Sequence, residues 1–510
     1  MSFTTKVCVP VCAPDLAALE SMTRDAAVLG DMVELRLDCL SQDQLRNSSA
    51  LLSELVHDIH VPIILTLRDP AQGGANSWPH DIRRNVWRNQ LLHIETMCDL
   101  EYDLVQEFAM DQSSLIDLSK VICSHHDFEG VPENLNDIFE RLAATPAGVI
   151  KIAVAAREIT DCLPIFRLLE HARQRNRRAI ILGMGNAGVV TRILGPSRGA
   201  YLTYGSFDTD ATTAPGQITT RDLRSVYRID KLNQETMITG LIGNPVMHSV
   251  SPDMHNAAFQ SEHINGVYLP LEVSDALTFF KRMVHPTSRE MNWNLKGLSV
   301  TAPHKSIVSS LLDWIDSKAE QIGVVNTVVL DGRTLRGYNT DADGFIEPLL
   351  KKLQSITDSR IAVLGAGGAA NAVVWALKAA GAEVTLFARD LHKAQILSQK
   401  FDVRCEQLNK AIFTGFDVVV NTTPLGTVGP HASQTPAFAE QLQNVGLVYD
   451  LIYNPLQTEL MNQARLAGCQ TLGGLSMLVS QACLQFELWT GRKISPSLMT
   501  NAALARLTKV

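Results

Sequence analysis

Three polar clusters in the middle of the chain carry residue types that proton transfer requires. Each follows or ends a short apolar run: Ser299-Val-Thr-Ala-Pro-His-Lys305, Gly323-Val-Val-Asn-Thr327 and Gly337-Tyr-Asn-Thr-Asp341. Polar clusters of this kind are expected at strand ends or in the loops after them. Lys305 paired with Asp341 could carry a proton to and from a hydroxyl, while the carboxamides of Asn326 and Asn339 hold neighbouring hydroxyls.

A glycine-rich loop follows these clusters. The apolar run Ile361–Leu364 leads into Gly365-Ala-Gly-Gly-Ala-Ala370 and then a helical pattern. This order predicts a dinucleotide site, in which the backbone amides at the start of the helix receive a pyrophosphate. Gly365, Ala366, Gly367, Gly368 and Ala369 are the candidate contacts. A proton shuttle beside a nicotinamide indicates an alcohol dehydrogenase.

A different chemistry is indicated by a lysine inside an apolar run, Val149-Ile-Lys-Ile-Ala-Val154. The stem of Lys151 could pack while its ammonium reaches the surface. Alternatively, the lysine is desolvated near other cations, an environment suited to imine formation. His125 and His126 lie in a neighbouring run, and because adjacent strand residues point to opposite faces, only one of them can face an interior.

The elements that must position these residues recur through the first half. Eight apolar, β-rich runs are separated mostly by polar segments of helical length, such as Ile82–Thr96 and Asn134–Ala143. The runs are Val7–Cys12, Val33–Leu37, Pro62–Leu67, Tyr102–Phe108, Val121–Ser124, Gly148–Val154, Arg178–Gly183 and Ala200–Gly205. Eight β-then-α units predict a (β/α)8 barrel, whose reactive groups lie at the C-terminal strand ends. Charged and polar candidates fall there: Glu34, Arg36, Arg68, His126, Lys151, Arg192 and Gln217.

Composition excludes several classes of protein. The chain has 510 residues, 46% hydrophobic and 19% charged, so two or three domains of an ordinary globular protein are expected. A net charge of −8 without a dense basic run argues against nucleic acid, and no apolar run approaches a membrane span. The N-terminus enters a strand pattern without a signal or transit peptide. The nine cysteines show no CxxC spacing or metal cluster, so we expect free thiols, no metal and a cytoplasmic location.

The second half resembles shikimate dehydrogenase over residues 238–505. Besides the three polar clusters, the matching motifs are Gly243-Asn-Pro-Val-Met-His-Ser-Val-Ser-Pro252, Asn421-Thr-Thr-Pro-Leu-Gly426, Asp450-Leu-Ile-Tyr-Asn-Pro455 and Gly474-Leu-Ser-Met-Leu-Val-Ser-Gln481. The resemblance implies that Lys305 and Asp341 are catalytic. It implies a substrate site formed by Ser249, Ser251, Thr301, Asn326, Asn339, Tyr453 and Gln481. It also adds Thr422 and Gly474 to the cofactor contacts.

The first half, residues 5–228, resembles type I 3-dehydroquinate dehydratase. The matches are Glu34-Leu-Arg36, Arg68 before Gly73-Gly74, Ile122-Cys-Ser-His-His-Asp-Phe128, Val149-Ile-Lys-Ile-Ala153, Met184-Gly185, Arg192-Ile-Leu194 and Ala214-Pro-Gly-Gln217. The resemblance implies an imine between Lys151 and the C3 ketone of 3-dehydroquinate, with His126 as the proton carrier. Glu34, Arg36, Arg68, Arg192, Thr213 and Gln217 would bind the substrate, Arg192 through its carboxylate. The family usually carries glutamate where this chain has Gln72, and serine where it has Thr213.

Together the resemblances imply one bifunctional enzyme of the shikimate pathway. It would convert 3-dehydroquinate to 3-dehydroshikimate and reduce that product to shikimate with NADPH. The implied domains are residues 1–230 for the dehydratase barrel, 236–342 for substrate binding, with the helix 475–505 returning to it, and 343–474 for a Rossmann NADP-binding domain. Two alternatives remain open: a barrel that acts only as a degenerate scaffold for the dehydrogenase, and quinate as the preferred substrate of the second half.

The choice of cofactor depends on the residues after the second Rossmann strand, Val384-Thr-Leu-Phe-Ala-Arg-Asp390. An acidic residue there binds the ribose 2′-hydroxyl of NAD, whereas an arginine accommodates the 2′-phosphate of NADP. Arg389 stands at the expected position and Lys393 lies one helical turn further, which favours NADP. Asp390 lies one residue later, where the resembling enzymes usually have threonine, and could repel a phosphate.

Overall fold

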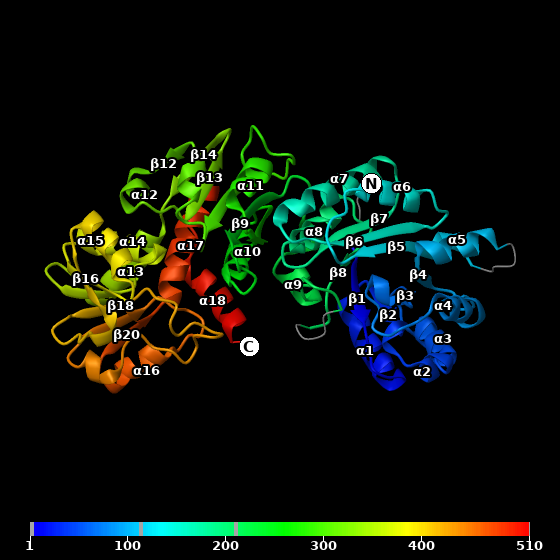
Figure 1. The fold of residues 1–510 in the computed structure, drawn as a ribbon, viewed down its shortest axis with the longest axis horizontal. Coiled ribbons are helices and arrows are strands. Elements are labelled where there is room, and N and C mark those ends of the chain that lie inside the picture. Colours follow the sequence, from blue (N-terminus) through cyan, green and yellow to red (C-terminus); the bar gives the residue numbers. More distant parts are fainter. Residues whose placement is uncertain (1–4, 112–115, 209–212, 509–510) are drawn as a thin grey trace. The chain divides into compact units, whose positions relative to one another are not determined.

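The computed structural model describes residues 5–111, 116–208 and 213–508, and its chain forms two compact units (Figure 1). The first unit comprises Met1–Thr236, Pro270–Met283 and Glu290–Asn294, and the second comprises Met237–Leu269, Val284–Arg289 and Leu295–Val510.

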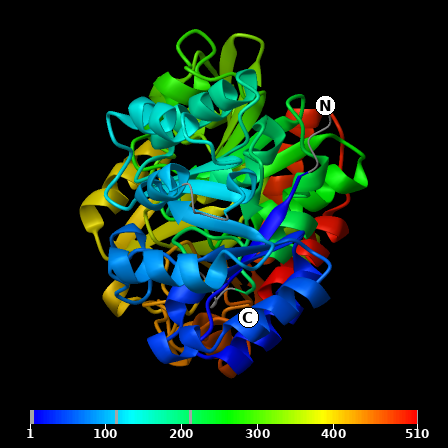
Figure 2. The same cartoon turned by 90° about the vertical axis from the view of Figure 1, so that its right-hand side faces the viewer.

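A parallel eight-stranded sheet forms the centre of the first unit, in the spatial order β7-β6-β5-β4-β3-β2-β1-β8. The strands are β1 Val7–Val11, β2 Met32–Arg36, β3 Ile63–Thr66, β4 Met97–Glu101, β5 Val121–Asp127, β6 Val149–Ala155, β7 Ala179–Met184 and β8 Thr203–Tyr204. The Tyr201 N–H donates to the carbonyl of Ala179 over 2.8 Å, which brings the two ends of the sheet together. This confirms the predicted (β/α)8 barrel. Figure 2 shows the barrel facing the viewer.

The helices of this unit pack against the barrel strands because one face of each is apolar. In α6, for example, Leu135, Ile138, Phe139 and Leu142 are buried at helical spacing. The helices are α1 Leu16–Leu29, α2 Gln42–Arg46, α3 Ser49–Asp58, α4 His80–Val86, α5 Tyr102–Met110, α6 Leu135–Ala143, α7 Cys162–Gln174, α8 Val189–Leu194 and α9 Thr220–Ser225. The short helix α9 completes the eighth β-then-α unit, as expected.

The predicted fourth strand, Tyr102–Phe108, is wrong. These residues lie in helix α5, and the strand is the preceding segment, Met97-Cys-Asp-Leu-Glu101. Asp99 and Glu101 are both buried in that strand. Two carboxylates in five residues hide the apolar signal of a strand, whereas Leu104, Val105 and Phe108 form the buried face of a helix.

The second unit contains a mixed sheet in the order β10-β9-β11-β13-β14-β12. Its strands are β9 Met237–Gly243, β10 Gly266–Glu272, β11 Leu295–Val300, β12 Trp314–Ile315, β13 Thr327–Asp331 and β14 Thr334–Tyr338. Its helices are α10 Ser251–Ser261, α12 Ser317–Ile322 and α13 Asp341–Leu353, whereas α11 Ala276–Phe279 belongs to the segment Pro270–Met283 of the first unit. The polar clusters read from the sequence follow β11, precede β13 and follow β14, so all three lie at strand ends.

A second sheet of this unit is parallel, in the order β17-β16-β15-β18-β19-β20, which is the strand order of a Rossmann fold. Its strands are β15 Arg360–Leu364, β16 Glu383–Ala388, β17 Arg404–Gln407, β18 Val418–Asn421, β19 Leu447–Asp450 and β20 Gln470–Gly473. Its helices are α14 Gly368–Ala379, α15 Leu391–Phe401 and α16 Glu459–Leu466. The predicted Rossmann fold is therefore confirmed.

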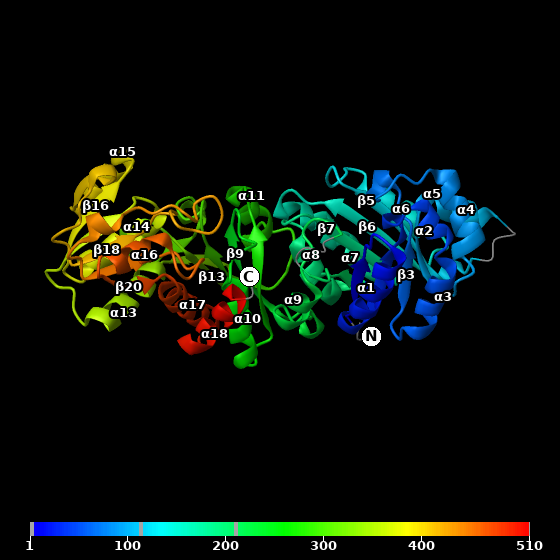
Figure 3. The ribbon, with the colours of Figure 1, turned by 90° about the horizontal axis from the view of Figure 1, so that it is seen from below.

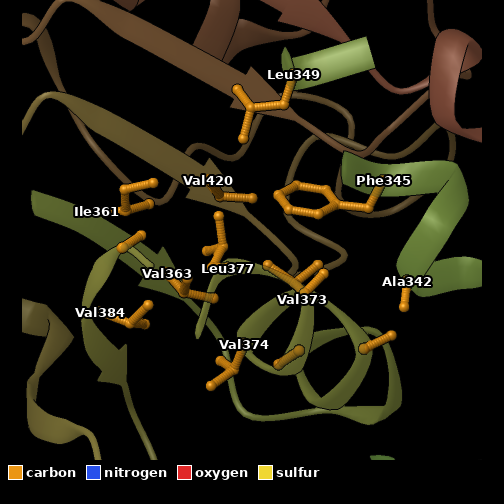
Figure 4. Close-up of a cluster of buried hydrophobic side chains, with 14 of the residues drawn as sticks. Ala342, Phe345, Leu349, Ile361, Val363, Val373, Val374, Leu377, Val384 and Val420 are labelled. Carbon is orange, nitrogen blue, oxygen red and sulfur yellow. The ribbon is translucent and has the colours of Figure 1, made fainter. Parts of the chain in front are cut away.

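The core that holds this parallel sheet against its helices is purely apolar (Figure 4). Val363 and Val420 of the sheet meet Val373 and Leu377 of α14, and Phe345 of α13 joins the same cluster. Phe345 also stacks on Tyr449 of β19, with ring centroids 5.2 Å apart. Helix α13 begins at Asp341, so the packing of Phe345 fixes the helix that carries a candidate catalytic residue.

The last helices, α17 Leu475–Thr490 and α18 Pro496–Leu507, pack against α10 and α13 (Figure 3). The indole N–H of Trp489 donates to the carbonyl of Val328 in β13, over 3.0 Å. Gly344 of α13 lies directly against Gln481, because a Cβ at Gly344 would be 2.7 Å from the Cβ of Gln481. This close approach brings Gln481 to the start of α13.

The cysteines differ from the expectation of free thiols at two positions. Cys12 and Cys39 form a disulfide between the ends of two early segments of the barrel, with their Cα atoms 5.6 Å apart. They lie 27 residues apart in the chain, so no spacing motif indicated the pair. The other seven cysteines are free. Within the described residues, no helix has both the length and the apolar character needed to cross a membrane.

Candidate active sites

One cavity at the C-terminal ends of the barrel strands collects every candidate residue of the first half. Predicted residues that line it are Glu34, Arg36, Arg68, His126, Lys151, Arg192, Thr213 and Gln217. They come from strands β2, β5 and β6, from the segment after β3, from helix α8 and from the loop before α9, which is how barrels of this type assemble a site. Gln72, Gly73, Phe128, Ala153, Leu182, Met184, Tyr204 and Ala214 also line the cavity.

Lys151 is the buried centre of this cavity, with 5% of its surface exposed. Its ammonium lies 2.9 Å from Asp99 Oδ2 and 3.3 Å from Glu34 Oε1, and 4.5 Å from the ring centroid of Tyr204. The ammonium therefore does not reach the surface. Its nearest charged neighbours are carboxylates, and not the cations that the sequence suggested.

Arg68 extends this ion pair into a buried network. Its guanidinium pairs with Asp99 at 2.7 Å and with Glu101 at 3.5 Å, and donates to the Ser124 hydroxyl. Glu101 pairs in turn with the buried Arg83 at 2.7 Å. Burial would raise the pKa of Asp99, but Arg68 and Lys151 outweigh it and hold that pKa well below its usual range.

His126 faces the cavity, as predicted for the second histidine of the pair. Burial, with the positive charges of Arg68 and Lys151, holds the pKa of His126 well below its usual range. The imidazole is therefore neutral at pH 7 and able to accept a proton. The His126 backbone N–H donates to Gln72 Oε1 over 3.1 Å, so the unusual glutamine is in contact with the strand that carries the histidine.

Arg192 is a buried cation with little to neutralise it. It is 1% exposed, its Nε has no hydrogen-bond partner among the described residues, and one terminal nitrogen reaches the carbonyl of Pro215 at 3.5 Å. Burial lowers the pKa of Arg192 to about 10, which leaves it charged at neutral pH. An arginine held in this way is suited to an anion that enters the cavity.

The polar residues around the rim hold one another in place. Arg36 forms a bidentate pair with Asp38, at 2.9 and 2.7 Å, and donates to the carbonyl of Gly73. Thr213 and Gln217 bond each other through the Gln217 amide and the Thr213 hydroxyl at 3.1 Å. Threonine at position 213 thus retains the hydroxyl that serine would supply.

Asp99 and Tyr204 are the residues of this site that the sequence analysis missed. Asp99 was missed because the fourth strand was predicted at Tyr102–Phe108, whereas the strand that carries Asp99 is the preceding segment, Met97–Glu101. Tyr204 lies in the predicted strand Ala200–Gly205, but a tyrosine at a strand end is usually packing. In the structure it is 4% exposed, and its hydroxyl has no partner among the described residues.

A second cavity lies in the second unit between the mixed sheet and the start of α14. Predicted residues that line it are Ser249, Ser251, Thr301, Lys305, Asn326, Asp341, Tyr453 and Gln481. Ala369 and Gly474, expected at the cofactor, also line this cavity. A Cβ at Gly368 would lie 3.7 Å from Lys305 Cδ, so the glycine loop approaches the candidate catalytic lysine.

Lys305 and Asp341 are paired in this cavity. Lys305 Nζ lies 2.5 Å from Asp341 Oδ2, and Asn326 Nδ2 donates to Asp341 Oδ1 over 2.8 Å. Asp341 is therefore held on both oxygens, and its position at the first turn of α13 is fixed. Lys305 lies in the turn after β11, with 22% of its side chain exposed.

Asn339 lies apart from the other candidates. It is not among the residues that line the cavity, although it is buried beside them. Its Nδ2 donates to the carbonyl of Val324 over 2.8 Å, and its Oδ1 accepts from the Ala342 N–H at the start of α13. Both ends of this carboxamide are used in the fold.

The wall of the second cavity contains a buried hydrogen-bond network that sequence reasoning missed. The Tyr268 hydroxyl donates to Ser299 over 2.8 Å, and the Ser299 hydroxyl donates to Gln485 Oε1 over 2.7 Å. The Gln485 amide donates to Thr327 over 3.0 Å, and Thr327 donates to Asn326 over 2.8 Å. Tyr268 and Gln485 lie outside the motifs, which is why spacing gave no signal.

A groove at the C-terminal edge of the parallel sheet matches the predicted cofactor site. It is lined by Gly365, Ala366, Gly367, Ala388, Arg389, Asp390, Lys393, Leu408, Thr422, Thr423 and Pro424. Gly365 has a φ of +112°, and a Cβ there would lie 2.6 Å from Thr422 Oγ1, so the loop requires glycine. The groove leads onto the N-terminus of the twelve-residue helix α14, where a pyrophosphate would find free N–H groups.

Asp390 has a structural role that the sequence analysis did not anticipate. It is the N-cap of α15, and its Oδ1 accepts from the Lys393 N–H over 3.2 Å. Its Oδ2 lies 3.8 Å from Lys393 Nζ. The carboxylate is thereby engaged by the helix, and Arg389 remains exposed beside it.

No group of three metal-ligating side chains occurs in the described part of the chain.

Comparisons with known proteins give family matches in both halves of the chain. A family model described as type I 3-dehydroquinase matches residues 7–234. Models described as shikimate dehydrogenase substrate binding domain, shikimate/quinate 5-dehydrogenase and shikimate 5'-dehydrogenase C-terminal domain match residues 241–328, 347–445 and 474–504.

Among individual relatives, some match about half of the chain and one matches nearly all of it. A shikimate dehydrogenase (NADP(+)) of Caldanaerobacter subterraneus is 39% identical over 51% of this chain and 94% of its own. A crystal structure of a shikimate dehydrogenase in complex with NADP+ is 34% identical, covers 54% of this chain and 97% of that chain, and has a TM-score of 0.51. The chloroplastic bifunctional 3-dehydroquinate dehydratase/shikimate dehydrogenase of Arabidopsis thaliana is 33% identical over 95% of this chain and 82% of its own length. The chain therefore belongs to the family of bifunctional 3-dehydroquinate dehydratase/shikimate dehydrogenases.

Proposed function

We propose that this chain catalyses two consecutive reactions of the shikimate pathway, each in one of the two cavities. The barrel dehydrates 3-dehydroquinate to 3-dehydroshikimate, and the second unit reduces 3-dehydroshikimate to shikimate with NADPH. The observation that carries the proposal is the buried Lys151, held between carboxylates in a cavity that also contains a neutral His126 and an unpaired Arg192. Burying these charges costs desolvation free energy, and a barrel that served only as a scaffold would gain nothing in return.

The dehydration proceeds through an imine. Lys151 Nζ gives up its ammonium proton and adds to the C3 ketone as the free amine; loss of water and return of one proton to the nitrogen leave a protonated imine on Lys151. That cation accepts electron density, so the C2–H bond can break and its proton passes to His126. The electron pair then expels the C1 hydroxyl, which leaves as water with the proton from His126. Hydrolysis of the imine releases 3-dehydroshikimate and restores Lys151, so the net change is loss of one water.

Substrate orientation in the barrel follows from the charges. Arg192 binds the substrate carboxylate, because it is the buried cation without an anionic partner. Arg36, Glu34 and the Thr213–Gln217 pair lie around the rim and bind hydroxyls. These roles use donors and acceptors that point into one cavity.

The second reaction needs a proton at the oxygen that becomes a hydroxyl. The cofactor NADPH, when bound, supplies the hydride. Lys305 donates the proton to the ketone oxygen, and Asp341 holds the lysine ammonium and restores its proton. Ser249 and Ser251, near the N-terminus of α10, bind the carboxylate, while Asn326, Gln481 and Tyr453 are the proposed hydroxyl ligands.

NADP is the cofactor that the groove accommodates. Gly365 to Ala369 receive the pyrophosphate at the start of α14, and Thr422 and Gly474 border the nicotinamide side. Arg389 and Lys393 bind the 2′-phosphate, while the Asp390 carboxylate caps α15 and lies 3.8 Å from Lys393 Nζ.

We also propose the domain limits 1–230, 236–342 with 475–505, and 343–474, which limited proteolysis would test at residues 231–235. We also propose a cytoplasmic location: the seven free cysteines favour it, whereas the Cys12–Cys39 disulfide does not. Assay of both activities in separated cell fractions checks it, since the Arabidopsis relative is named as chloroplastic.

The imine mechanism predicts a covalent adduct on Lys151. Borohydride added during turnover of 3-dehydroquinate should reduce the imine and fix the substrate carbon skeleton to this residue, and peptide mass spectrometry locates it. Lys151→Arg keeps the charge but cannot form the imine, so it should show no adduct. An adduct on another lysine would exclude the mechanism.

Gln72→Glu should raise the dehydratase rate. The new carboxylate can still accept from the His126 N–H, and its charge would make the imidazole a stronger base. Gln72→Ala removes the acceptor and should lower the rate, which separates the charge from the hydrogen bond. Steady-state formation of 3-dehydroshikimate measures both, and an unchanged or lower rate in Gln72→Glu means that this position does not limit catalysis.

Lys305→Ala and Asp341→Asn should each lower the reduction rate about 10²–10⁴-fold, because they remove one proton-transfer unit. The double variant should be little slower than either single variant. The dehydratase activity of the same proteins is the internal control and should remain. Losses that multiply in the double variant would contradict a paired role.

Arg389→Ala should reduce the preference for NADP over NAD about 10–100-fold, because it removes hydrogen bonds to the charged 2′-phosphate. The ratio of kcat/KM for the two cofactors measures it. Arg404→Ala, an exposed cation on the neighbouring strand β17, is the control and should keep the ratio. A variant lacking Arg389 that prefers NADP as strongly as the parent protein would refute the assignment.

A further inference from the structure

Asp99 is a buried carboxylate at the centre of the barrel that the dehydration steps above do not use. It is 1% exposed and does not line the cavity. Its Oδ2 contacts two cations, Lys151 Nζ at 2.9 Å and Arg68 Nη2 at 2.7 Å. Its Oδ1 has no hydrogen-bond partner among the described residues. Its direct contacts are therefore Lys151 and Arg68, and its charge also acts on His126.

Several charged and titratable groups face this carboxylate and Lys151 from the other strands. They are Cys8 from β1, Glu34 and Arg36 from β2, Arg68 after β3, Glu101 from β4, His126 from β5 and Tyr204 from β8. The two cations beside Asp99 hold its pKa well below its usual range, so it stays ionised across the working pH range. A proton released at Lys151 therefore does not remain on Asp99.

Glu34 differs from Asp99 although both contact the lysine. Glu34 lines the cavity, accepts from the Thr66 hydroxyl at 2.8 Å and lies 3.3 Å from the ammonium. It is positioned to meet the substrate. Asp99 contacts the nitrogen more closely and does not line the cavity, and it is also held by Arg68.

We propose that Asp99 is the counter-ion of the protonated imine formed on Lys151, an inference that rests on the proposed dehydratase function. The imine accepts electron density only while its nitrogen carries a proton. A carboxylate in contact with that nitrogen favours the cation over the neutral imine, and it does so strongly because water is excluded. Arg68 keeps the carboxylate in place and prevents it from becoming the proton acceptor, a role left to His126.

The inference predicts a shift in pH dependence in Asp99→Asn. The neutral amide keeps the shape of the side chain but removes the counter-ion, so the imine loses its proton at lower pH. Cyanoborohydride reduces the protonated imine, and the yield of adduct with 3-dehydroquinate on the full-length chain reports it by intact mass. The alkaline midpoint of the yield, and that of kcat, should fall by about one pH unit or more.

Glu101→Gln is the matched control. Glu101 lies on the same strand, is equally buried and pairs with the same Arg68, but it pairs with Arg83 where Asp99 pairs with Lys151. Glu101→Gln should lower the stability of the protein and its kcat, but it should leave the alkaline midpoint of the adduct yield unchanged. Asp99→Glu, which keeps the charge, should keep the midpoint near that of the parent protein.

Three results would overturn the inference. One is an unchanged midpoint in Asp99→Asn, and another is an equal shift in Glu101→Gln. The third, no adduct on Lys151 in the parent protein at any pH, would refute the dehydratase mechanism together with the counter-ion. If Asp99→Asn does not fold, as judged by the circular dichroism of the barrel, the smaller neutral Asp99→Ser gives the same comparison.

Discussion

The barrel site depends on the pairing of charges that water cannot reach. Placing one ammonium in a dry interior costs several kcal/mol unless it meets an anion. Lys151 meets two, and one of them, Asp99, is itself shared with Arg68, which leads to Glu101 and then Arg83. Removing one member of such a chain leaves its neighbour charged and unpaired, a loss of about 3–5 kcal/mol. Stability and chemistry in this half therefore rest on the same ions.

Arg192 is the exception that gives the network its function. Every other buried cation of the site has a carboxylate in contact, whereas Arg192, within the described residues, reaches a carbonyl and no carboxylate. The fold bears the desolvation of this guanidinium, and an incoming carboxylate offsets it. The paired ions fix the positions of the catalytic groups. Arg192, which lacks a carboxylate partner among the described residues, is the ion that binds the incoming anion.

Much of this arrangement was predictable from the sequence, and the failures share a cause. The barrel, the Rossmann fold and the residues Lys151, His126 and Arg192 were found because apolar runs and motif spacing mark them. The fourth strand and Asp99 were missed together, because a strand that carries buried carboxylates loses its apolar signature. The Cys12–Cys39 pair was missed because a contact between the ends of two neighbouring strands leaves no spacing motif in the chain.

The second unit shows a different limit of sequence reasoning: the sequence does not show which polar side chains are already hydrogen-bonded within the fold. Residue type suggested that Asp390 could repel a phosphate and that Asn339 could bind a hydroxyl. In the fold, Asp390 caps α15, and Asn339 bonds backbone at both ends of its carboxamide. Asn326 is similarly engaged, yet it lines the cavity and holds Asp341. A side chain becomes available to a ligand only after the backbone has been satisfied, and this depends on helix starts and strand ends that the sequence places only approximately.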